Sequence, residues 1–405
     1  MSDVTLWIAV LALAFLGSRR AATQPGSRWG FTSGAELILL GVAVAPGMLG
    51  LVDKRTLAGA SPFAIVAIAW LGLLIGVQFG TVGTRPMRVR RLLLATVFAA
   101  AAGAIAAGLF WAVARPFWPL DQRQLLLCCL GVGAVSSETT RYAVAAVVAK
   151  ARVRGAIAEL MQDLAEGDDA VPIVALAFGL ALLPSPLSAT VSPVGITLAT
   201  IGVGVAVGLV AAALLRVELR ATETFSILLG TTLLCVGIAE RYHLAGITVC
   251  FAQGLAIAMF SGRRRELGKM LARSEHAVLV PLLIVAGMHV DLGAERWIIG
   301  ATLLAVVCRF LAKSLTGAAV RLVPAASNAG PALVFGFLPA GALNMAFGLA
   351  FALRFEGPVG SIVLGASAIS CIVGEALGPP AINRVLQRES GSDPPPDLVK
   401  EVTAP

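Results

Sequence analysis

The chain has 405 residues, of which 58% are hydrophobic and only 13% are charged, with a mean hydropathy of +0.88. A soluble domain of this length would carry charge at about a quarter of its positions, so the composition excludes an ordinary soluble globular protein. The formal net charge of +8 does not by itself indicate nucleic-acid binding, because basic residues in membrane proteins gather in cytoplasmic loops.

Apolar runs long enough to cross a bilayer recur along the whole chain. We identify thirteen segments and interpret them as helices of an all-α polytopic membrane protein. Their approximate cores are Val4–Gly17, Ala35–Val52, Pro62–Gly80, Leu92–Ala114, Leu125–Ala149, Ala156–Leu183, Val194–Leu215, Phe225–Ala239, Gly246–Phe260, Ala277–Val290, Trp297–Val320, Pro331–Leu353 and Pro358–Gly378.

The loops between these segments alternate in charge. One set of loops holds 21 basic residues and the opposite set holds 7, while the remaining 3 of the 31, Arg141, Arg309 and Lys313, fall within predicted helices. The positive-inside rule therefore places the N-terminus outside and the C-terminus in the cytoplasm, as an odd number of helices requires. We expect a multi-pass protein of the cell (inner) membrane, and topology accounts for its basic balance.

Two adjacent carboxylates, Asp168 and Asp169, lie within the predicted segment Ala156–Leu183. Carboxylates are costly in hydrocarbon, and membrane proteins that retain them usually use them on an ion or proton path. Adjacent residues on a helix point in different directions, so the two aspartates should have different neighbours. This pair is the first candidate for an ion or proton site.

Three further acidic residues precede the pair. Glu159, Asp163 and Glu166 recur at i, i+4 and i+7, which places them on one helix face. This stripe could attract cations into a cytoplasmic funnel. Alternatively, Glu159 and Asp163 lie in a solvated first turn or pair with Arg152 and Arg154.

Buried carboxylates need a counter-charge, and Arg309 and Lys313 are the most deeply placed basic residues of the predicted helices. They stand four residues apart in Trp297–Val320. One can pair with an aspartate, while the other could extend toward the cytoplasmic side. Lysine suits a switch better than arginine, because burial can remove the proton of a lysine whereas arginine stays charged.

Two predicted helices carry polar interruptions, AVSSETT at Ala134–Thr140 and LPAGALN at Leu338–Asn344. Non-helical backbone at membrane depth is tolerated only where it lines a cavity, and a pair of broken helices in the two halves of a transporter points to its ion site. The side chains that could supply oxygens there are Ser136, Ser137, Glu138, Thr139 and Asn344.

The placement of these features indicates an internal repeat. Predicted segments four to six end with the aspartate helix, and segments eleven to thirteen begin with the lysine helix. Three is odd, so the two sets run in opposite orientations. This is the inverted-repeat organisation of secondary transporters, with the site at the repeat interface near the midplane.

Several stretches together resemble the cation:proton antiporter superfamily, most closely its bacterial sodium/proton exchanger branch with a paired Asp-Asp motif. They are SGAELILLGV, GVGAVSSETT, RGAIAELMQDLAEGDDAVPIV, VPLLIVAGMHVDL, RFLAKSLTGAAVRL and GEALGPPAINRVLQR. The resemblance implies that Asp169 takes the cation or protons and that Asp168 forms a salt bridge with Lys313. It also implies that the broken fifth and twelfth helices cross near these residues.

The resemblance further implies a core domain that slides against a dimerisation domain in a homodimer. Residues 1–90 and 223–295 would form the dimerisation domain, 91–190 and 296–386 the core, 191–222 a linker helix and 387–405 a disordered cytoplasmic tail. The expected activity is electrogenic Na⁺/H⁺ exchange by an elevator-type mechanism serving pH homeostasis, without a cofactor.

The chain departs from the pattern of the superfamily that it resembles at three positions, where it carries Glu138, Glu166 and Arg309. These residues leave open the ion preference among Na⁺, Li⁺ and K⁺ and the proton stoichiometry. A K⁺/H⁺ antiporter of the same fold is therefore the main alternative. A passive cation channel and an intramembrane aspartyl protease are remote alternatives from other classes.

Overall fold

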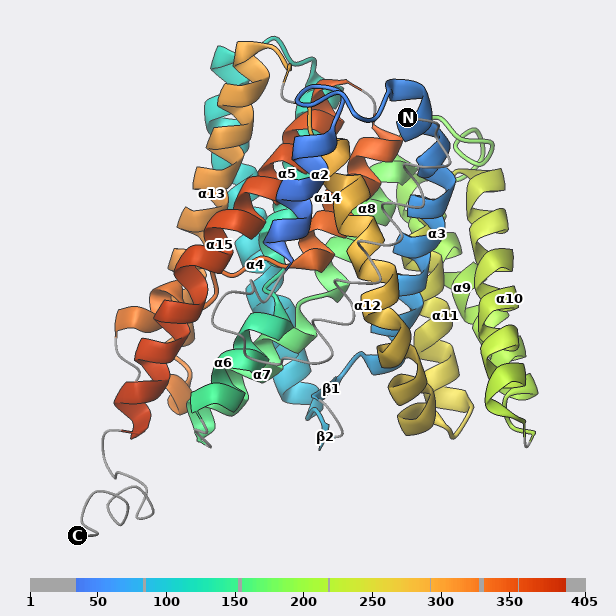
Figure 1. The fold of residues 1–405 in the computed structure, drawn as a ribbon. Coiled ribbons are helices and arrows are strands. Elements are labelled where there is room, and N and C mark those ends of the chain that lie inside the picture. Colours follow the sequence, from blue (N-terminus) through green and yellow to red (C-terminus); the bar gives the residue numbers. More distant parts are fainter. Residues whose placement is uncertain are drawn as a thin grey trace, which may run out of the picture.

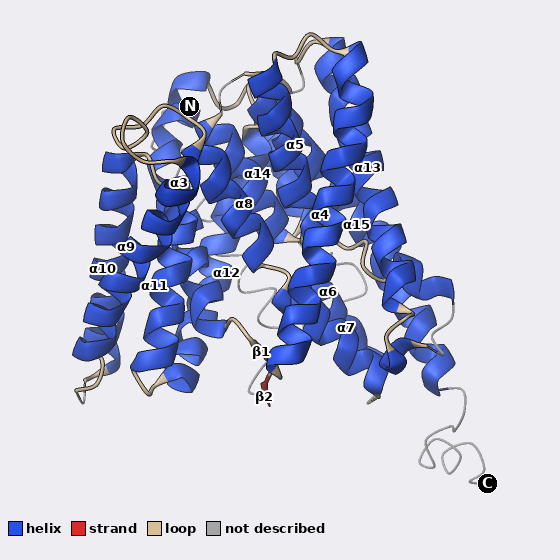
Figure 2. Cartoon of the chain, turned by 180° about the vertical axis from the view of Figure 1, so that it is seen from behind, coloured by secondary structure: helices blue, strands red, loops and turns tan. Residues whose placement is uncertain are grey.

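The structure is a computed structural model that describes residues 34–390 apart from 83–84, 152–154, 218, 292, 328–330 and 356. It is helical almost throughout (Figures 1 and 2). The helices are α2 (Ala35–Val44), α3 (Lys54–Gln78), α4 (Val89–Phe117), α5 (Gln122–Ser137), α6 (Arg141–Ala151), α7 (Ala156–Gly167), α8 (Ala170–Ala181), α9 (Pro193–Leu214), α10 (Ala221–Tyr242), α11 (Gly246–Phe260), α12 (Arg264–Met288), α13 (Arg296–Val320), α14 (Ala342–Arg354) and α15 (Pro358–Ser390). Two short 3₁₀ helices, η1 (Pro324–Ala326) and η2 (Pro331–Phe335), and one hairpin of β1 (Thr81–Val82) and β2 (Arg85–Pro86) complete the described part.

Within the described residues, seven helices are long and apolar enough to cross a membrane: α3, α4, α9, α10, α12, α13 and α15. The interrupted helices are shorter because each predicted span is divided into two pieces. The predicted segment Val4–Gly17 lies outside the described residues, as does most of the predicted tail.

The helices pack into two groups. We call α2, α3 and α9–α12 the α11 bundle, because α11 packs most extensively on α3 and α9, and α12 packs on α2 and α3. We call α4–α8 and α13–α15 the α13 bundle, because α4 packs on α5 and α13, and α15 packs on α13 and α14. In Figure 1, α3 and α9–α11 lie to the right, α13 and α15 lie to the left, and α2 and α12 lie between them. Contacts between the bundles are fewer and involve mainly α8, α12 and α14.

Small residues bring α3 and α11 into close backbone contact. A Cβ atom at Gly76 would overlap the carbonyl oxygen of Phe251, and one at Gly254 would overlap the carbonyl oxygen of Leu73. Close packing of this kind drives helix association in membranes, where hydrophobic burial between helices contributes little. The α11 bundle is therefore held together by backbone-to-backbone packing.

Both predicted helix breaks are present in the structure. Helix α5 stops at Ser137 and α6 starts at Arg141, while residues before α14 run without regular structure from Leu338. The two non-helical segments touch, since the Thr140 N–H donates to the carbonyl oxygen of Pro339 at 3.1 Å. A Cβ atom at Gly341 would overlap the Thr140 side chain, so glycine is needed at this crossing.

The predicted segment Ala156–Leu183 is not one continuous helix. Helix α7 ends at Gly167 and α8 begins at Ala170, which leaves Asp168 and Asp169 at the junction. Pro172 explains the break, because it lacks the N–H that would bond to the carbonyl of Asp168 and its ring crowds that carbonyl. The aspartates thus lie at a helix junction in the interior.

Two predicted boundaries are wrong. Helix α12 begins at Arg264, well before the predicted Ala277, since Leu267 and Leu271 give this polar stretch a buried face. Helix α15 continues to Ser390, past Gly378 and the predicted start of the tail. Glu275, which lies between the predicted segments Gly246–Phe260 and Ala277–Val290, is therefore part of a helix.

Replacing Gly76 by Leu should destabilise the protein by about 1–3 kcal/mol, because the new side chain overlaps the α11 backbone. The measurement is thermal unfolding of the detergent-solubilised protein. The matched control is Gly230→Leu on α10, where a Cβ atom meets no other atom within 4 Å. Equal losses of stability in both variants would contradict the close approach.

Candidate functional site

The two adjacent aspartates are buried and line different small cavities. Asp168 is 3% exposed and Asp169 is 2% exposed. Each cavity has about 20 Å³ of space, enough for roughly one water molecule. The cavity of Asp168 lies within the α13 bundle, between α4, α7 and α13. The cavity of Asp169 lies between the bundles, with α3 and α12 forming one wall.

Lys313 connects Asp168 to the break between α5 and α6. Its ammonium donates to the carbonyl oxygen of Ser137 at 2.6 Å and to the hydroxyl of Thr139 at 2.7 Å. The same ammonium nitrogen lies 3.9 Å from Asp168 Oδ2, an ion pair that is too long for a hydrogen bond. Lys313 therefore donates hydrogen bonds to the break between α5 and α6 and also places a positive charge beside Asp168.

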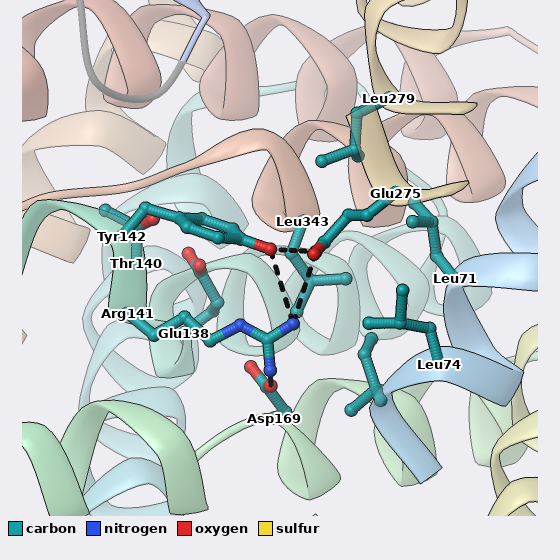
Figure 3. A pocket seen from close by; sticks show the side chains of 11 residues that line it. Leu71, Leu74, Glu138, Thr140, Arg141, Tyr142, Asp169, Glu275, Leu279 and Leu343 are labelled. Atoms are coloured by element: carbon teal, nitrogen blue, oxygen red, sulfur yellow. Dashed lines mark hydrogen bonds and ion pairs between the residues drawn. The ribbon is translucent and has the colours of Figure 1, made fainter. Parts of the chain in front are cut away.

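Arg141 is the cationic neighbour of Asp169. Its guanidinium lies 4.0 Å from Asp169 Oδ2 and 3.0 Å from Glu166 Oε1. Figure 3 shows this guanidinium between Asp169 on one side and Glu275 and Tyr142 on the other. The two aspartates thus have separate counter-charges, as expected from their directions on a helix.

Arg309 is buried within the α13 bundle, with 1% of its surface exposed. It donates hydrogen bonds to the carbonyl oxygens of Val135 and Glu138, the latter at 2.9 Å. These carbonyls belong to the end of α5, where backbone acceptors have no helical partner. The sequence predicts that one of the two basic residues can pair with an aspartate and that the other could extend toward the cytoplasmic side; Lys313 lies beside Asp168, but Arg309 binds the broken helix and does not extend.

Several buried oxygens near the helix crossing have no hydrogen-bond partner among the described residues. They are Oε2 of Glu138, Oδ1 of Asp168, Oδ2 of Asp169, Oδ1 of Asn344 and the hydroxyl of Ser136. Glu138 shares the cavity of Asp169. Asn344 lies apart from both cavities, and its amide nitrogen faces Cys371 Sγ at 3.9 Å. The hydroxyl of Ser137, in contrast, donates a hydrogen bond to the carbonyl oxygen of Ala134 at 2.7 Å.

The acidic stripe before the aspartates is neutralised by arginines. Asp163 is fully buried and pairs with Arg85 and Arg91 at 2.5 Å each, and Arg91 also lies 3.2 Å from Glu159. These partners come from β2 and α4, whereas the expected partners at 152 and 154 lie outside the described residues. Glu166 belongs instead to the Asp169 site through Arg141.

The buried carboxylates of this site call for a small cation or protons as their partners. No group of three or more His, Cys, Asp or Glu side chains that could hold a metal ion occurs in the described ranges. Buried carboxylate oxygens without hydrogen bonds are costly unless a cation or a proton satisfies them. A monovalent ion or protons at Asp169 would meet that requirement.

Comparisons with known proteins identify the family of the chain. A family profile described as "Sodium/hydrogen exchanger, transmembrane" matches residues 11–382. The chain belongs to the sodium/hydrogen exchanger family. It is accordingly a multi-pass membrane transporter that exchanges cations for protons, and not an enzyme. The predicted antiporter family is confirmed, while the assignment to a branch with paired aspartates stays a prediction.

A solved structure of this type has the same fold. The sodium proton antiporter MjNhaP1 from Methanocaldococcus jannaschii at pH 8 matches with a TM-score of 0.67 and 17% sequence identity. The match covers 95% of this chain and 99% of that chain, which confirms the predicted all-helical antiporter fold. A search of curated proteins finds no match.

Sequence reasoning missed three residues that the structure brings to the Asp169 cavity: Arg141, Tyr142 and Glu275. The Tyr142 hydroxyl donates to Glu275, which also lies 3.3 Å from Arg141. A signal for Glu275 exists, because Leu267, Leu271 and Glu275 recur every four residues and so share one buried helix face.

Replacing Arg309 by Met should lower the free energy of unfolding, because the buried carbonyls of Val135 and Glu138 lose their donor. Each unsatisfied group costs about 1–3 kcal/mol. Thermal unfolding in detergent measures the loss, and Leu311→Met, at a half-exposed position of the same helix, is the control. An R309M protein as stable as the wild type would show that these bonds are dispensable.

Proposed function

We propose that this member of the family is an Na⁺/H⁺ antiporter in which Asp169 alternately carries Na⁺ and protons. The observation that supports this most directly is the environment of Asp169. The residue lines a water-sized cavity between the two helix bundles, has an oxygen without a hydrogen bond, and shares the cavity with Glu138. Asp168 lies instead inside the α13 bundle, with Lys313 beside it.

The proposed movement is that of an elevator. The α13 bundle, with residues 91–190 and 296–386, carries the site, and the α11 bundle without α9, with residues 1–90 and 223–295, forms the dimerisation domain of a homodimer. Helix α9 corresponds to the proposed linker at 191–222. In favour of this division, α3 and α11 pack backbone to backbone, whereas the Asp169 cavity opens at the boundary between the bundles. The C-terminus is proposed to be cytoplasmic, on the basis of loop charge.

The proposed mechanism is competition at one site. Na⁺ displaces protons from Asp169 on one side of the membrane, and protons displace Na⁺ on the other. Lys313 releases its proton when Asp168 is recruited to the ion, so the two residues titrate together. If two protons exchange for one Na⁺, one net charge moves per cycle, and each charge is worth about 2.3 kcal/mol per 100 mV.

Replacing Asp169 by Asn should abolish Na⁺-dependent proton release from proteoliposomes that carry a pH gradient, because the amide can neither bind a proton nor balance the charge of Na⁺. A pH-sensitive dye inside the vesicles reports the flux. Asp121→Asn is the matched control, since Asp121 caps α5 outside the site and Asn also caps helices well. Full activity of D169N would overturn the assignment.

Replacing Lys313 by Gln should leave Na⁺/H⁺ exchange measurable but remove its dependence on membrane potential, because one titrating group is lost from the cycle. Exchange rates are compared with and without a K⁺/valinomycin potential in the presence of Na⁺. An undiminished voltage response in K313Q would exclude Lys313 from proton transfer.

The same assay also tests the preference for K⁺ over Na⁺. For this purpose the wild-type protein is assayed with K⁺ as the sole external cation and without valinomycin.

A further inference from the structure

Arg141 is a cation that faces three carboxylates. Its guanidinium lies 3.0 Å from Glu166, 3.3 Å from Glu275 and 4.0 Å from Asp169. Among the ion pairs of the described residues, Arg141 is the only cationic partner of Asp169. One guanidinium carries a single positive charge and cannot neutralise three ionised carboxylates, and among these three Asp169 is the one whose Oδ2 has no hydrogen bond.

The three carboxylates belong to different bundles. Glu166 lies on α7 and Asp169 at the junction of α7 and α8, so both belong to the α13 bundle together with Arg141. Glu275 lies on α12 of the α11 bundle and is 7% exposed. The Arg141–Glu275 pair, supported by the hydroxyl of Tyr142, therefore crosses the boundary between the bundles (Figure 3).

The position of Arg141 has an electrostatic consequence for a cation at Asp169. A positive charge close to a carboxylate weakens the binding of a second positive charge there, and the effect is strong where water is excluded. Glu275 draws the guanidinium toward α12 and away from Asp169, because opposite charges attract across the same cavity. The closer the Arg141 guanidinium stays to Glu275, the less it opposes the binding of a cation at Asp169.

We propose that Arg141 is a built-in competitor of the transported cation at Asp169, and that Glu275 sets the strength of this competition from the opposite bundle. The proposal rests on the antiport function proposed for Asp169. Because Glu275 and Arg141 lie on different bundles, their separation changes whenever the bundles move relative to one another. Cation affinity at Asp169 is then tied to the relative position of the bundles: high when Arg141 contacts Glu275, and low when it does not.

The test is the Na⁺ concentration dependence of exchange in proteoliposomes. Glu275→Gln should raise the KM for Na⁺ by about tenfold with a smaller change in maximal rate, since the freed guanidinium moves to Asp169. Arg141→Gln should lower the KM. In the double variant the KM should follow that of R141Q, because Glu275 acts only through Arg141. Glu275→Asp should restore most of the wild-type KM.

The matched control is Glu266→Gln on the same helix, whose carboxylate pairs with Arg263 on the surface. It should leave the KM unchanged. An unchanged KM in E275Q, or the same rise of KM whether or not Arg141 is present, overturns the proposal. Loss of maximal rate alone in both single variants also overturns it, because that is the result of a purely structural contact.

A binding measurement separates this proposal from the proposed function. Na⁺ that binds the folded protein raises its melting temperature in a concentration-dependent manner. E275Q should need about tenfold more Na⁺ than the wild type for the same rise, even if R141Q does not fold. If the wild type binds Na⁺ with this dependence on Glu275 but does not release protons, the antiport function fails and the competition stands. If E275Q and the wild type respond to Na⁺ alike while exchange is normal, only the competition fails.

Discussion

The structure depends on one constraint, which is that helices interrupted inside a membrane protein must find partners for their free backbone groups. At the end of α5 these partners are Arg309 and Lys313, one turn apart on α13. A lysine ammonium has three donors, so Lys313 can serve the carbonyl of Ser137 and still lie beside Asp168. The position of α13, the shape of the crossing and the charge of the site are therefore fixed by the same few hydrogen bonds.

The two aspartates are adjacent in the sequence, but their surroundings differ. A helix junction turns Asp168 toward the interior of the α13 bundle and Asp169 toward the other bundle. Each carboxylate meets a cation on its own side, Lys313 or Arg141. The two aspartates thus differ in counter-charge and in surroundings although they are adjacent in the chain, and they do not share one cavity.

The sequence predicts the helical fold, both helix breaks and the burial of the aspartates, because proline, glycine and polar residues stand out within apolar runs. It predicts a break at Ala134–Thr140 but not which donors satisfy it, since the direction of the Arg309 side chain depends on packing. Glu275 is not predicted as a site residue, because a search for apolar runs overlooks the part of a helix that lies in a basic stretch such as Arg264–Arg273. Pairings between elements that are distant in the chain, such as that of Arg85 on β2 with Asp163 on α7, have no local signature at all.

The connection from α3 to α4 is anchored at both ends. On one side, Arg264 of α12 donates to the carbonyl oxygens of Val77 and Phe79 and so holds the end of α3. On the other side, Arg85 of the hairpin is bound to Asp163 on α7. Between these anchors lies Gly80, whose φ of 76° is one that other residues rarely adopt. The covalent connection between the two bundles is therefore short and held on both sides, so any bending between the bundles at this end falls on the few residues between Phe79 and Arg85.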